Sequence, residues 1–366
     1  MSKKTPHQLS RRAFGLGTLS AATLTALAAC AGGGGAGGSG GTTVAFANKG
    51  MNFFFFVVQN EAIKRKSEEL DYQYKTTDAN QDAGQQFNDW NSLLVSSPAF
   101  VIADPIDSKG LETVVKQTAG RDIPVGIVDT PLTKGVADFT IAFDNYRGGE
   151  MAAEKTVELL KKRYGREKGT VLNAYGALSS SAWSGRKKGF EDVMKKYPDI
   201  EVLSRPTDGD ETKAKSVAGA TLSEFPTLDA AHSPSDAITR GLVTTLKSEG
   251  RTGDPDAKDH VILTSIDGEP QALDWIRAGV LDASVSQDPV AYGEVCVELL
   301  HKYSLKGEDI PLEPYENKDY YWEKAPIEKT DQGPTCVIPP FFITADNVDD
   351  KRHWANVVTN DWGMQQ

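Results

Sequence analysis

The chain is poor in cysteines, long apolar runs and basic stripes, and each shortage excludes a class of protein. Its 366 residues include three cysteines, and its five histidines show no metal-ligand spacing, so we expect neither a metal nor a cofactor. The weakly apolar segment 13–29 is too short and too mild for a stable membrane span. The formal net charge is −11, and nucleic-acid affinity depends on neutralising phosphates, so we expect no nucleic-acid partner.

The first 29 residues have the pattern of a secretory signal peptide. An arginine pair at 11–12 precedes the weakly apolar run, which is typical of the twin-arginine export route. Residues 27–30 (Leu-Ala-Ala-Cys) resemble a bacterial lipobox, in which the cysteine becomes the lipidated first residue. The sequence therefore predicts lipidation of Cys30. The alternative is an ordinary signal peptide that is cleaved just before an incidental cysteine.

A glycine-rich stretch follows the predicted lipidation site. Residues 31–42 contain almost only glycine, alanine and serine, a composition that cannot bury apolar surface and behaves as flexible coil. A phosphate-binding glycine loop would need a strand before it and a helix after it, and this stretch has neither. We therefore expect residues 30–42 to tether a lipid anchor to a folded body outside the cytoplasmic membrane, in the periplasm or on the outer face.

Two further cysteines, Cys296 and Cys336, remain as an even pair if the first one is lipidated. In an oxidising compartment such a pair can form a disulfide. The bridge requires Cα atoms within about 7 Å of each other. Two separate buried thiols are the alternative, and the sequence leaves both open.

From residue 43 onward, short apolar runs alternate with amphipathic helical patterns. The expected helices are 53–70, 83–94, 108–118, 148–163, 182–196, 211–225, 235–249 and 271–278. The expected strands are 44–46, 72–74, 99–103, 124–128, 170–174, 201–204, 228–231, 261–266, 283–286 and 337–344. This alternation predicts parallel sheets covered by helices on both faces. A body of this length suggests two domains, and ligands of such sheets lie beyond the carboxyl ends of the strands.

Three other segments fit this scheme less simply. Residues 315–324 are polar and aromatic and are interpreted as a loop or edge insertion. The late strand contains Pro339 and Pro340, which cannot lie inside a sheet, so it is expected to cross between lobes. The tail 351–366 is expected to pack as a short helix or to fray.

Six short segments carry a resemblance through their order and spacing. They are residues 52–56 (Asn-Phe-Phe-Phe-Phe), 127–130 (Ile-Val-Asp-Thr), 143–149 (Phe-Asp-Asn-Tyr-Arg-Gly-Gly), 186–190 (Arg-Lys-Lys-Gly-Phe), 265–268 (Ser-Ile-Asp-Gly) and 286–289 (Ser-Gln-Asp-Pro). The body resembles the periplasmic sugar-binding proteins of the ribose/galactose type, the receptors of ABC importers. The resemblance implies a type I periplasmic binding protein fold, α/β, with two doubly wound parallel-sheet lobes joined by three hinge crossings.

The resemblance also implies where the lobes divide. The crossings are expected near residues 144–145, 287–288 and 335–340. The N-terminal lobe would then comprise residues 43–144 and 288–336, and the C-terminal lobe residues 145–287 and 337–366.

A sugar site must replace the water bonded to every hydroxyl that it buries, because an unsatisfied buried polar group costs about 1–3 kcal/mol. Carboxylates, amides and guanidinium groups supply these bonds, and aromatic rings cover the apolar faces of the sugar. Four residues match ligand contacts of the family: Asp129, Arg186, Asp267 and Gln287. Helix caps or ion pairs between the lobes are the alternative roles for these four side chains.

Five further positions bear on the ligand. Phe55 and Phe56 match the aromatic pair that lies against the sugar, although one of them is also suited to the core. Asn52 matches a family asparagine, and Ser235 stands where relatives often bind with asparagine. We hypothesise that Trp183, one helical turn before the arginine, supplies the stacking face that relatives carry at the position of Gly209.

The implied function is capture of a monosaccharide and its delivery to the permease of an ABC importer, by a monomer without enzymatic activity. One alternative is a sensory receptor that presents a sugar or signalling molecule to a membrane kinase. Another is a carbohydrate-active enzyme that uses Asp129 and Asp267 as paired carboxylates. The identity of the sugar is left open.

Overall fold

A computed structural model describes residues 42–366 and contains two mostly parallel sheets. The predicted lipidation of Cys30, the signal peptide and nearly all of the tether lie outside the described residues. Within residues 42–366, no helix has both the length and the apolar character needed to cross a membrane.

The first sheet has seven strands in the order β13-β14-β5-β4-β3-β1-β2. Their bounds are β1 Thr43–Asn48, β2 Gln73–Asp78, β3 Phe100–Ala103, β4 Val125–Val128, β5 Phe139–Phe143, β13 Ile327–Thr330 and β14 Gly333–Ile338. All neighbours are parallel except β13 and β14. The central strands β1, β3, β4 and β5 are buried along their whole length, as expected when helices cover both faces.

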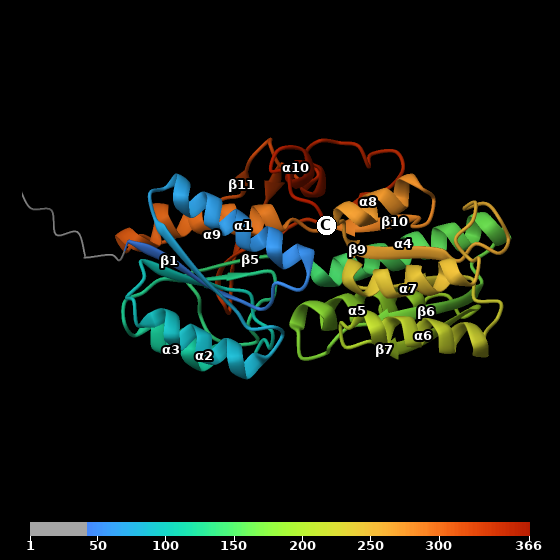
Figure 1. The fold of residues 1–366 in the computed structure, drawn as a ribbon, viewed down its shortest axis with the longest axis horizontal. Coiled ribbons are helices and arrows are strands. Elements are labelled where there is room, and N and C mark those ends of the chain that lie inside the picture. Colours follow the sequence, from blue (N-terminus) through green and yellow to red (C-terminus); the bar gives the residue numbers. More distant parts are fainter. Residues whose placement is uncertain (1–41) are drawn as a thin grey trace, which may run out of the picture. The chain divides into compact units, whose positions relative to one another are not determined.

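Four helices cover this sheet (Figure 1). Helices α1 (Phe54–Glu69) and α9 (Pro289–Lys302) pack together on one face, and α2 (Ala83–Leu94) and α3 (Glu112–Ala119) lie on the other. The close contact between α1 and α9 places two segments side by side that are more than 200 residues apart in the chain.

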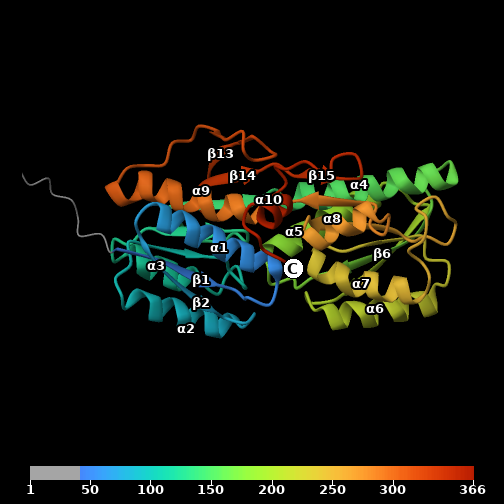
Figure 2. The ribbon, with the colours of Figure 1, turned by 45° about the horizontal axis from the view of Figure 1, so that its top comes forward.

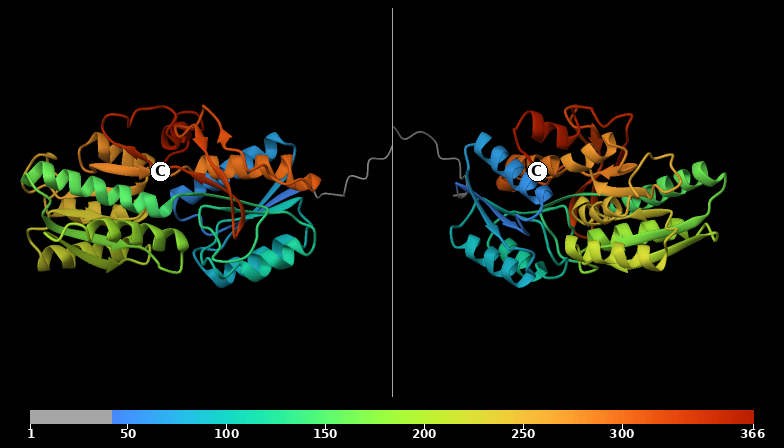
Figure 3. Two further views of the ribbon diagram at one scale, coloured as in Figure 1. Left: turned by 180° about the vertical axis from the view of Figure 1, so that it is seen from behind. Right: turned by 45° about the vertical axis from the view of Figure 1, so that its right-hand side comes forward.

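The second sheet has six strands in the order β15-β10-β9-β8-β6-β7, and only β15 is antiparallel to its neighbour. The strand bounds are β6 Gly169–Tyr175, β7 Ile200–Pro206, β8 Ala230–His232, β9 Ile262–Asp267, β10 Ala283–Ser286 and β15 Phe341–Ile343. The helices are α4 Asn145–Tyr164, α5 Ser181–Met194, α6 Glu211–Glu224, α7 Asp236–Ser248, α8 Pro270–Arg277 and α10 Trp354–Asn360. Helices α4 and α5 pack against each other on one face, and α6 and α7 pair on the other (Figures 2 and 3).

The chain changes sheets three times. It leaves the first sheet after β5 at Asp144, returns from the second after β10 at Gln287 and Asp288, and leaves again between β14 and β15. The third change falls at Pro339 and Pro340, which lack the N–H group that a sheet ladder needs. The first two changes fall at the predicted lobe boundaries after residues 144 and 287, whereas residues 337–338, which were assigned to the C-terminal lobe, still pair with β5 of the first sheet.

The predicted α/β alternation is confirmed, but several elements differ from the prediction. Strand β5 and helix α9 were not predicted, and α3 begins at Glu112 rather than at 108. The prediction of one strand over 337–344 is wrong, because its two halves belong to different sheets. The polar insertion forms the short hairpin β11 (Tyr315–Glu316) and β12 (Lys324–Ala325), and the 3₁₀ turn η1 (Ser304–Lys306) follows α9. The tail forms α10.

Of the two alternatives for Cys296 and Cys336, the structure has two separate buried thiols and no disulfide between them. Cys296 on α9 lies over β4, where a β-carbon at Gly126 would collide with its sulfur. Cys336 lies on β14, two strands away in the sheet order. Neighbouring strands are about 4.8 Å apart, so the two backbones are separated by more than a disulfide spans.

Candidate functional site

The predicted site residues gather where loops from the carboxyl ends of both sheets meet. Two adjacent cavities lie there, an inner chamber of about 30 Å³ and an outer cleft of about 420 Å³. The inner chamber is lined by eight of the nine predicted ligand residues: Phe55, Phe56, Asp129, Trp183, Arg186, Ser235, Asp267 and Gln287. The ninth, Asn52, lines the outer cleft instead.

Asp267, at the end of β9, is the centre of the polar network in the inner chamber. Its Oδ1 accepts hydrogen bonds from Gln287 Nε2 at 2.5 Å and from Arg186 Nη1 at 3.3 Å, and its Oδ2 accepts from the backbone N–H of Asp236 at 3.0 Å. Burial raises the pKa of the carboxyl group to about 7, although the nearby guanidinium acts in the opposite direction. Tyr292 fixes the other end of the amide by donating to Gln287 Oε1 at 2.9 Å.

Arg186 is a buried cation whose position is set from several sides. Its Nε donates to Asn145 Oδ1 at 2.7 Å, and its Nη1 donates to the carbonyl of Pro234 at 2.6 Å. The guanidinium lies 5.1 Å from the ring centroid of Phe143, a favourable cation–π distance. Because α4, the loop before α7 and β9 all contribute partners, the guanidinium is held in place before any ligand contacts it.

Asp129 lies at the end of β4 with φ 60°, a left-handed conformation that turns its side chain into the site. Lys49 Nζ lies 3.2 Å from its Oδ2, 2.6 Å from Asp104 Oδ1 and 2.9 Å from the hydroxyl of Thr130. Burial lowers the pKa of Lys49, but the two carboxylates outweigh burial and raise it. Burial raises the pKa of Asp104 well above its ordinary value.

Lys49 and Asp104 are functional candidates that sequence reasoning missed. Both directly follow strands, β1 and β3, so the carboxyl-end rule that selected Asp129 would have selected them too. Lys49 also contacts Asp129, so the carboxylate of Asp129 both pairs with a cation and lines the chamber.

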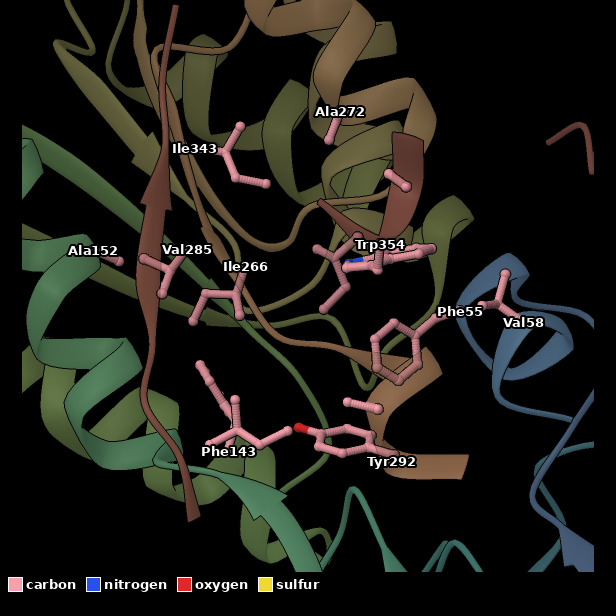
Figure 4. Close-up of a cluster of buried hydrophobic side chains, with 14 of the residues drawn as sticks. Phe55, Val58, Phe143, Ala152, Ile266, Ala272, Val285, Tyr292, Ile343 and Trp354 are labelled. Atoms are coloured by element: carbon pink, nitrogen blue, oxygen red, sulfur yellow. The ribbon is translucent and has the colours of Figure 1, made fainter. Parts of the chain in front are cut away.

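The two phenylalanines occupy different surroundings. Phe55 makes edge-to-face contacts with Tyr292 and Trp354 at centroid distances of 6.3 and 6.0 Å, and Figure 4 shows it between these two rings. Phe56 meets Phe55 edge-to-face at 5.6 Å and lies 4.9 Å beneath the ammonium of Lys49. Phe55 therefore belongs to a buried aromatic cluster, and Phe56 supports the ionic group.

Glu269 joins the two lobes next to the chamber and was not predicted. Helix α1 has no side-chain cap, and its amide at Phe55 donates to Glu269 Oε1 at 3.3 Å. Arg240 Nη1 donates to the second oxygen at 2.7 Å. Glu269, which follows β9 of the second sheet, thus caps α1, which covers the first sheet. The N-terminus of a helix is a favourable position for negative charge.

A model of the periplasmic binding protein domain matches residues 44–309. The chain belongs to the periplasmic binding protein family. The ribose import binding protein of Salmonella typhimurium is 27% identical over 268 residues, which are 73% of this chain and 86% of that protein. The D-apiose import binding protein of Actinobacillus succinogenes is 27% identical over 227 residues, 62% of this chain and 69% of that one.

Solved periplasmic binding proteins have the same fold. A carbohydrate transporter solute binding protein from Agrobacterium radiobacter, in complex with D-arabinose, has a TM-score of 0.74 at 18% identity and covers 87% of this chain and 100% of its own. An ABC transporter solute binding protein from Bacillus halodurans with bound myo-inositol has a TM-score of 0.72 at 21% identity, covering 86% and 99%. The family resemblance and the two-lobe fold are therefore confirmed.

Trp183 has a place in this periplasmic binding protein that only glycines allow. Its ring lies so close to Gly176 and Gly209 that a β-carbon at either position would overlap it. Gly209 also has φ 83°, which disfavours a side chain. The ring therefore occupies the space that a larger residue at Gly209 would fill, and it lines both the chamber and the cleft.

Ser235 has a structural role beside its place in the chamber. It is the N-cap of α7, and its hydroxyl accepts from the backbone N–H of Ile238 at 3.5 Å. Helix capping is the alternative role that the sequence suggests for residues at such positions.

Within residues 42–366, no group of three or more histidine, cysteine or acidic side chains is arranged to hold a metal ion.

Proposed function

We propose that this periplasmic binding protein is an extracytoplasmic receptor that captures a monosaccharide between its lobes and delivers it to an ABC importer. The observation that carries the proposal is the convergence of Arg186, Asp267 and Gln287, from three different elements, on one chamber with aromatic walls. The named relatives are import binding proteins, which favours transport over sensing.

The chamber suits polyhydroxyl ligands because it offers both kinds of hydrogen-bonding partner. Asp267 accepts, Arg186 donates, and the amide of Gln287 does both. Such bonds with charged groups are stronger than those between neutral groups, and they replace the water that a hydroxyl loses. Phe56 and Trp183 supply apolar surface for the carbon faces of a sugar ring. No covalent step is proposed.

Ligand entry requires the lobes to move apart. The inner chamber measures about 30 Å³, whereas one water molecule needs about 10–15 Å³ on the same scale. A sugar therefore enters when the lobes open at the three crossings, and the closed form is the one presented to the permease. We further propose a monomer that is held to the membrane by lipid at Cys30.

A thermal-shift panel of the purified full chain against pentoses, hexoses, polyols and nucleosides tests the proposal. A ligand present at a hundredfold excess over its Kd stabilises the folded state by about 2.7 kcal/mol, which raises the unfolding midpoint visibly. One responding sugar class supports the receptor function. The absence of any response, or turnover of a sugar to products, would contradict it.

A further inference from the structure

Tyr292 on α9 carries a buried hydroxyl group next to the ligand site. The side chain is fully buried, and it lines neither the inner chamber nor the outer cleft. Its ring packs edge-to-face on Phe55, and Figure 4 shows the hydroxyl oxygen directed away from that ring. A phenylalanine would supply the same packing without a polar group that needs a partner. Packing alone therefore does not account for the hydroxyl.

The hydroxyl of Tyr292 is bonded to a residue that does line the chamber. It donates to Gln287 Oε1 at 2.9 Å, and the Gln287 side chain is itself buried. Burial raises the pKa of Tyr292 well above its ordinary value, so the phenol keeps its proton and remains a donor. The amide oxygen of Gln287 thus has a donor that depends on neither ligand nor water.

The nitrogen end of the same amide is held from the second sheet. Gln287 Nε2 donates to Asp267 Oδ1 at 2.5 Å, and Asp267 is the last residue of β9. Tyr292, by contrast, belongs to a helix that covers the first sheet. Gln287 lies between these two elements, at the second of the three crossings. Its amide is therefore fixed from both lobes at once.

These two bonds leave one hydrogen of the Gln287 amide for a ligand. An amide nitrogen carries two hydrogens, and Asp267 accepts one of them. The acceptor for the second can be a hydroxyl or a ring oxygen of a sugar. Ordering a flexible glutamine side chain costs conformational entropy. When the folded protein has already ordered it, ligand binding does not carry that cost, and affinity is higher.

We propose that Tyr292 is a positioning residue of the ligand site, whose hydroxyl holds the amide of Gln287 so that its remaining N–H donates to the ligand. Tyr292 acts through Gln287 and does not touch the ligand itself. The inference rests on the proposed function, because it names a residue on which sugar affinity at the same site depends.

The substitution Tyr292→Phe removes the hydroxyl and keeps the ring, and calorimetry on the full chain measures its effect. The probe is the sugar that gives the largest response in the thermal-shift panel. We expect the Kd to rise at least fivefold, because the amide oxygen loses its donor and the side chain becomes free to rotate. Equal affinity in the native chain and Tyr292→Phe would overturn the inference and leave the receptor function intact. If no sugar binds the native chain, both proposals fail.

The matched control is Tyr74→Phe, which removes a bond of the same chemistry elsewhere. The hydroxyl of Tyr74 donates to Asn60 Oδ1 at 2.7 Å, and neither residue lines the chamber or the cleft. Both substitutions should lower the unfolding midpoint by similar amounts, but Tyr74→Phe should leave the sugar Kd unchanged. An equal loss of affinity in Tyr74→Phe would show that affinity follows stability and would overturn the positioning role.

A measurement without ligand separates positioning from a general structural effect. In nitrogen-15 NMR, the side-chain amide signal of Gln287 is identified by its absence from Gln287→Met. This signal should shift and exchange faster with water in Tyr292→Phe, and it should stay in place in Tyr74→Phe. A signal that does not move in Tyr292→Phe, even with weaker sugar binding, would show that the hydroxyl does not act through Gln287 and would overturn the inference.

Discussion

Ionisation of Asp267 should make ligand binding depend on pH. Burial raises the pKa of this carboxyl group to about 7, with Glu269 adding to the rise and Arg186 opposing it. The ionised form accepts from the guanidinium and from Gln287 and, in the proposed function, from sugar hydroxyls, whereas the protonated form gives up one acceptor position. Asp267→Asn removes the titration and keeps the size of the side chain.

The pH dependence can be worked out from this pKa. The ionised fraction falls about tenfold for each pH unit below the pKa, so the sugar Kd should rise as the pH falls below 7, level off about 10–100-fold higher when the protonated form dominates, and be flat above pH 7. Stability should change in the opposite direction. In the unfolded chain the pKa is about 3.9, so between about pH 4 and 7 the native state binds more protons. The stability that the protonated group contributes is complete below pH 4 and is lost as the pH rises to 7.

Calorimetry with the responding sugar from pH 5 to 9 checks this reasoning. Asp267→Asn should bind with a pH-independent Kd, and at pH 8 about 10–100-fold more weakly, since hydrogen bonds to charged groups contribute about 1.5–3 kcal/mol. The control is Asp274→Asn, an exposed carboxylate on α8, which should behave as the native protein does. A native Kd that is constant from pH 5 to 8, or a slope that persists in Asp267→Asn, would refute the assignment of the proton to Asp267.

Three further predictions concern single side chains. Trp183→Ala should weaken sugar binding at least tenfold in calorimetry, with Trp183→Phe intermediate, because the ring supplies stacking surface; an unchanged affinity would contradict this role. Trp354→Ala should lower the free energy of unfolding in denaturant by about 3–5 kcal/mol, because the ring is fully buried and its N–H is bonded; a loss below 1 kcal/mol would contradict its place in the core. A reducing agent should leave the unfolding midpoint unchanged, since Cys296 and Cys336 are free; a shift would indicate a disulfide.

Much of the fold could be predicted because local patterns and sheet position agree. Buried parallel strands appear as short apolar runs, and amphipathic helices separate them, so most elements were found. Helix α9 was missed because apolar residues surround it on all sides between α1 and the sheet, which removes the amphipathic signal. Strand β5 was missed because four apolar residues and one threonine, one residue before a helix, give no period of their own.

The site could be predicted only as far as each residue carries its own signal. Asp129, Asp267 and Gln287 follow strands and match family motifs, and the structure brings them to one chamber. The pairing of Lys49 with Asp104 joins the ends of two strands that are not consecutive in the chain, so only the sheet order reveals it. The contact of Glu269 with α1 depends on how the two lobes meet, and the chain offers no local pattern for it.

The C-terminal segment connects the residues of both lobes that form the chamber, although it lies beyond the residues that the family model matches. Trp354 donates its indole N–H to the carbonyl of Asp267 at 3.0 Å, while its ring contacts Phe55 on the opposite lobe. Gln366 donates to Glu269, the same carboxylate that caps α1. A ligand shifts the balance between open and closed forms only by its difference in affinity for them. Contacts that hold the lobes together before binding lower the free energy that the ligand must supply, so the affinity for sugar should depend on this segment as well as on the residues that touch the sugar.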